Sequence, residues 1–61
     1  MSQLNHIELQ NLRHLIGAHE TACQKMQNYA QQSQDQQIKN YFEKSAQDAQ
    51  KTKQQLMSFL G

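Results

Sequence analysis

The sequence contains no proline and no tryptophan, only two glycines and a single cysteine. Without proline, nothing inside a long helical segment removes a backbone donor or forces a kink. One cysteine, Cys23, excludes a disulfide within the chain. The chain also lacks a run of about eighteen apolar residues, so it is predicted not to span a membrane.

Charge of one sign is lacking as well, because six Lys and Arg residues stand against five Asp and Glu. This balance is not the basic surface typical of nucleic-acid binding, so no nucleic-acid partner is expected. The first residues have neither the basic nor the apolar region of a secretory signal, and the cytoplasm is the expected compartment. No glycine-rich loop is available to build an oxyanion site, so we expect neither catalysis nor a cofactor.

What the sequence does contain is an apolar residue at every third or fourth position in two segments of similar length. This spacing places the apolar side chains on one side of each of two helices. The pattern pauses in a glutamine-rich stretch between them. We predict one all-α domain over residues 1–61, with a helix at about 5–32, a turn at about 33–35 and a helix at about 36–60. So short a connection makes the helices an antiparallel hairpin.

Two signals mark where the helices begin. Asn5 and Glu8 have the spacing of a capping box, in which each side chain bonds to the backbone N–H of the other residue. The second helix has two candidate caps, either Asp35 or Ser33 paired with Gln36.

Sixty-one residues in two helices bury little apolar surface, and at this size hydrophobic burial barely exceeds the entropy lost on folding. We therefore predict a homodimer in which two hairpins form a four-helix bundle. Thirteen glutamines suit the solvated faces of such helices. The residues predicted for the core or the dimer contact are Leu9, Leu12, Leu15, Ile16, His19, Cys23, Met26, Ile38, Phe42, Ala49, Leu56, Phe59 and Leu60.

His19 and Cys23 are four residues apart on this apolar side, which is a spacing that can present two ligands to one metal ion. The alternative is a packed cysteine beside a histidine that bonds to Ser45 or Thr52. We favour the packed alternative and predict no metal site.

The segments Leu12-Arg13-His14-Leu15-Ile16, His19-Glu20 and Tyr29-Ala30-Gln31-Gln32, followed by Asp35, Ile38 and Phe42, carry a family resemblance. From about Leu9 to Leu60 the chain resembles the small spore coat protein F-like proteins of endospore-forming bacteria, which have a ferritin-like helical fold. Longer relatives fill a four-helix bundle from one chain, whereas this chain supplies two helices. The resemblance implies a spore-associated structural protein without catalytic residues, whose partners include other coat proteins.

The expected function is therefore structural or assembly-related and associated with sporulation. Two alternatives remain open. One is a helical binding module for a protein partner or RNA, since hairpins of the plasmid RNA-one-modulator type dimerise and bind RNA. The other is a metal-binding hairpin that uses His19 and Cys23.

Overall fold

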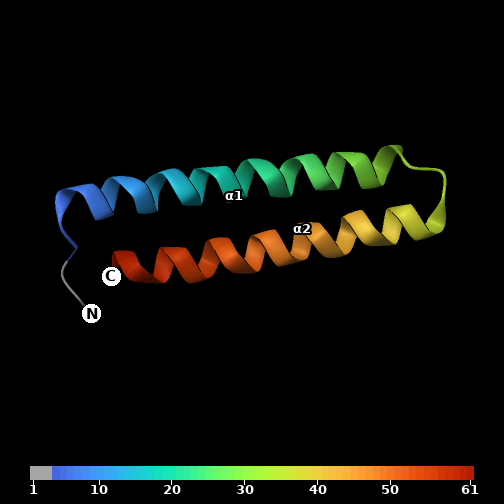
Figure 1. The fold of residues 1–61 in the computed structure, drawn as a ribbon. Coiled ribbons are helices and arrows are strands. Elements are labelled where there is room, and N and C mark those ends of the chain that lie inside the picture. Colours follow the sequence, from blue (N-terminus) through green and yellow to red (C-terminus); the bar gives the residue numbers. More distant parts are fainter. Residues whose placement is uncertain (1–3) are drawn as a thin grey trace.

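The computed structural model describes residues 4–61 and consists of two long helices packed side by side (Figure 1). Helix α1 covers His6–Gln32 and helix α2 covers Gln36–Met57, and a short 3₁₀ helix, η1, follows at Ser58–Leu60. The helices run antiparallel, so the start of α1 and the end of the chain lie at the same end of the molecule (Figure 1). The predicted all-α hairpin is confirmed. Its dimensions of 46 × 16 × 11 Å describe a flat rod rather than a sphere.

Helix α1 begins with the predicted capping box. The Asn5 side-chain oxygen accepts a hydrogen bond from the Glu8 N–H at 2.8 Å, and the Glu8 carboxylate accepts one from the Asn5 N–H at 3.0 Å. Two backbone donors at the helix end are thus satisfied, and the Glu8 carboxylate lies where the helix dipole favours negative charge.

Asp35 is the residue that caps α2, which decides between the two predicted caps. Its carboxylate accepts hydrogen bonds from the N–H groups of Gln37 and Ile38 at 2.8 and 3.2 Å. Ser33 serves the turn in another way, because its hydroxyl donates to the Asp35 carbonyl at 3.2 Å and its N–H donates to the Tyr29 carbonyl. Only three residues separate the helices, and this connection holds them antiparallel.

The core along the seam between the helices is small. Within residues 4–61 the buried apolar side chains are those of Leu12, Cys23, Ala30 and Ala46, and none of them is less than 3% exposed. Seven of the predicted core residues are half-buried, namely Leu9, Ile16, His19, Met26, Phe42, Ala49 and Leu56. Another four are exposed to about half of their surface, namely Leu15, Ile38, Phe59 and Leu60. A two-helix layer can bury only one line of side chains per helix, so the neighbours of that line stay in contact with water.

Candidate functional site

The two broad sides of the hairpin differ in chemistry, and their residues follow from a repeat of seven. Residues seven apart lie nearly two full turns apart, so they share one side of a helix. On one side of the seam these positions are Leu15, Ala22 and Tyr29 of α1 and Ile38, Ser45, Thr52 and Phe59 of the second half of the chain. We call this set the apolar face. Its large side chains lie near the two ends of the rod, and its small ones lie in the middle.

At the end where α1 begins and the chain ends, the apolar face is hollowed. An open depression of about 300 Å³ lies there, and we call it the terminal hollow. Its lining is formed by Leu4, Glu8, Asn11, Leu12, Leu15, Leu56 and Phe59. Leu12 of α1 and Leu56 of α2, both predicted for the core, line the same depression. Among residues 4–61, the polar side chains in this lining are those of Glu8 and Asn11, and both come from α1.

At the turn end, the apolar face carries exposed side chains in place of a depression. The Tyr29 ring packs against the Phe42 ring with 5.3 Å between centroids, and the Tyr41 ring meets the edge of the same phenylalanine at 5.7 Å. Tyr29 and Ile38 nevertheless remain 47% and 50% exposed. From α1, the ring contact of Phe42 is therefore with Tyr29, close to the turn.

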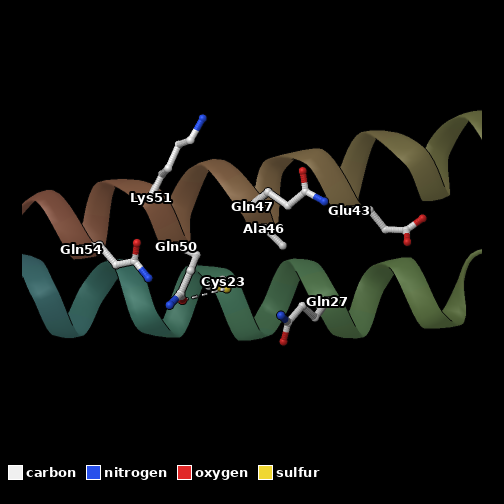
Figure 2. A pocket seen from close by; sticks show the side chains of 8 residues that line it. All are labelled: Cys23, Gln27, Glu43, Ala46, Gln47, Gln50, Lys51 and Gln54. Carbon is white, nitrogen blue, oxygen red and sulfur yellow. Dashed lines mark hydrogen bonds between the residues drawn. The ribbon is translucent and has the colours of Figure 1, made fainter.

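The opposite broad side is polar, and we call it the polar face. It contains an open depression of about 390 Å³ lined by Cys23, Gln27, Glu43, Ala46, Gln47, Gln50, Lys51 and Gln54. Figure 2 shows the Gln50 side chain reaching across the seam toward Cys23, while Lys51 points away from α1. The Cys23 thiol donates a weak hydrogen bond to the Gln50 side-chain oxygen at 3.8 Å. Lys53 of α2 pairs with Glu20 of α1 at 3.4 Å, so polar contacts bridge the helices on this side.

The pair His19 and Cys23 is engaged in other contacts. His19 Nδ1 lies 2.8 Å from the Leu15 carbonyl oxygen, and this acceptor requires the nitrogen to carry a proton. The predicted bond from His19 to Ser45 or Thr52 is therefore replaced by one within α1. Among residues 4–61, no group of three His, Cys, Asp or Glu side chains is arranged to hold a metal ion. Two side chains from one chain leave at least two ligands of a tetrahedral zinc site to be supplied from elsewhere.

Three residues of the seam are absent from the predicted core set, namely Ala30, Ala46 and Lys53. Ala30 is 3% exposed and lies four residues after Met26, which is a spacing that could have found it. Ala46 is 4% exposed, and the signal that could have found it is its position four after Phe42 and three before Ala49. The Lys53 side chain is only 17% exposed because its aliphatic part lies along the seam while its amine reaches Glu20. The same spacing marks Lys53, which lies four after Ala49, but a lysine is not usually read as a seam residue.

The chain matches no protein-family model, no curated protein and no solved structure. Neither α1 nor α2 has a stretch long and apolar enough to cross a membrane. The exposed apolar side chains and the terminal hollow make the apolar face the candidate site, since it is a surface suited to contact with another apolar surface.

Proposed function

We propose that this chain is a structural or assembly protein that acts as a homodimer, with two hairpins forming a four-helix bundle. The observation that carries the proposal is the area left in contact with water. The hairpin exposes 4972 Å², whereas a compact monomer of 7.1 kDa is expected to expose about 4,100 Å². The excess of about 900 Å² is close to the ~800 Å² that each partner buries in a standard protein–protein interface.

The apolar character of the exposed surface supports the same proposal. Eight large apolar residues within the described part of the chain are between 45% and 67% exposed, and four of them belong to the apolar face. Each Å² of apolar surface removed from water contributes about 25 cal/mol. Dimerisation through this face would add a second layer of helices and convert the seam into a bundle core.

The resemblance to spore coat protein F-like proteins extends the proposal to a cellular role. We take the assembled bundle to be a non-catalytic component of the spore or its coat, in contact with other coat proteins. The many exposed glutamines and lysines of both helices would remain outside the bundle core, where they are available for such contacts.

Sedimentation equilibrium at micromolar concentration tests the assembly. The expected mass is twice that of the chain, and the melting temperature should rise with protein concentration because association is coupled to folding. A cooperatively folded monomer whose melting temperature is independent of concentration would refute the proposal and would favour the binding-module alternative. Detection of the protein in purified spores, and not in growing cells, tests the cellular role separately.

A further inference from the structure

The apolar face has exposed apolar side chains at both ends, and the depression described on it lies at one of them. Tyr29 and Ile38 are 47% and 50% exposed at the turn end, and the terminal hollow lies at the opposite end. From these two features we infer that a second copy docks on the apolar face head to tail, by which we mean that the two rods lie antiparallel about a twofold axis. Tyr29 and Ile38 of each copy then enter the terminal hollow of the other. The inference rests on the proposed homodimer and specifies its contact surface and direction.

The positions of the two features along the rod agree with this arrangement. His19 lies at the middle of α1, and Tyr29 lies ten residues from it toward the turn, which is about 15 Å along the axis. The residues of α1 that line the hollow extend from Leu15 back to Glu8, on the other side of His19. Along the helix axis they lie about 6 to 17 Å from His19. A twofold axis through the middle of the rod therefore brings Tyr29 of one copy over the hollow of the other. The same operation brings the second Tyr29 over the first hollow, as an isologous contact requires.

The middle of the apolar face suits a close crossing. Ala22, Ser45 and Thr52 are small and half-buried, so they allow the axes of facing helices to approach each other. A head-to-head arrangement would use the same middle but would place protrusion against protrusion and hollow against hollow. Unfilled space at an apolar contact loses dispersion contacts, so the head-to-tail arrangement is the better packed one.

The chemistry of the hollow fits a tyrosine. Most of its lining is apolar, with Leu12, Leu56 and Phe59 among it, while the Glu8 and Asn11 side chains contribute polar atoms. A buried tyrosine places its ring in an apolar pocket and needs a hydrogen-bond partner for its hydroxyl. The polar face offers no comparable fit. Docking there would remove Glu43, Lys51 and several glutamines from water, at a cost unless each found a partner.

A second copy is preferred over a helix of another protein for two reasons on this surface. The excess exposed area is about that of one side of a standard interface. In addition, one and the same face carries both the protruding side chains and the depression that can receive them. A lone amphipathic helix laid along the seam would fill only the line between α1 and α2 and would leave the protrusion without a pocket.

Double electron–electron resonance, which measures the distance between two spin labels, decides whether the copies dock head to tail or head to head. Gln34 is exposed in the turn and lies outside the apolar face, so the full chain with Cys23→Ala and Gln34→Cys carries one spin label there. In the head-to-tail dimer the two labels lie at opposite ends of a rod 46 Å long, so a separation of that order is expected. In a head-to-head dimer the labels are within ~20 Å, because packed helices lie 8–10 Å apart. A short distance in a dimer overturns this inference and leaves the proposed homodimer intact, whereas a monomeric mass overturns both.

A pair of matched substitutions tests the contact itself. Tyr29→Lys should weaken dimerisation by roughly 30-fold or more, since it removes an aromatic anchor and introduces a charge into an apolar hollow. Met57→Lys is the control, because Met57 is 46% exposed, much like Tyr29, and lies seven residues after Gln50 on the polar-face side of α2, so a change below ~3-fold is expected. Equal effects of the two substitutions on the dissociation constant, with helix content retained, would contradict the docking of Tyr29. Should Tyr29→Lys fail to fold, Tyr29→Phe and the spin distance still test it.

Discussion

Truncation of Leu12 should be the most damaging single change to the hairpin. Leu12 is the largest of the four buried apolar residues and is 8% exposed, on the wall of the terminal hollow. Leu→Ala substitutions in cores cost about 2–5 kcal/mol, and the cost rises with the cavity that remains. The depression beside Leu12 is already open, so no closed cavity forms, and we expect about 2–3 kcal/mol per chain for Leu12→Ala.

This loss is large for a chain of this size. At ~0.05–0.15 kcal/mol per residue, 61 residues have a free energy of unfolding of about 3–9 kcal/mol. Urea denaturation followed by far-UV circular dichroism, at two protein concentrations, measures the change. The midpoint should fall substantially while the dependence on urea concentration keeps its slope.

Ile7→Ala is the matched control, because Ile7 is in the same helix but is 67% exposed and lies on neither the seam nor the apolar face. That substitution should change the free energy of unfolding by less than about 0.5 kcal/mol. If the urea midpoint of Leu12→Ala equals that of Ile7→Ala, the packing described along the seam is wrong.

Three further changes test other parts of the structure. Asn5→Ala removes the capping box and should lower the free energy of unfolding by about 1 kcal/mol in thermal melts, whereas an unchanged melting temperature would mean that the helix start frays. Gly17→Ala should raise the melting temperature by about 4–8 °C, a gain of up to ~1 kcal/mol, because an added Cβ meets nothing within 4 Å in mid-helix; a lower melting temperature would reveal a close neighbour there. The buried Cys23 thiol should react with a maleimide far more slowly in native protein than in denaturant, and equal rates would place it at the surface.

The sequence by itself determined the elements of secondary structure. Helix starts depend on contacts between residues three apart, as in Asn5 with Glu8, and such pairs can be recognised without knowledge of the fold. The absence of proline and the regular apolar spacing then predicted two long helices, and a three-residue turn determined that they run antiparallel. The end of the second helix was less predictable, because the last residues, Ser58–Leu60, tighten into the 3₁₀ helix η1 instead of continuing α2.

Only the tertiary structure decided which residues meet across the seam and what remains outside it. The ring contact of Phe42 with Tyr29 and the burial of Ala46 depend on how two helices settle against each other, and no local spacing specifies that fit. The terminal hollow and the protruding side chains at the turn end likewise exist only when α1 and α2 lie side by side. A periodic pattern defines the side of a helix that faces a partner, but the depth at which each side chain sits is set by non-local packing.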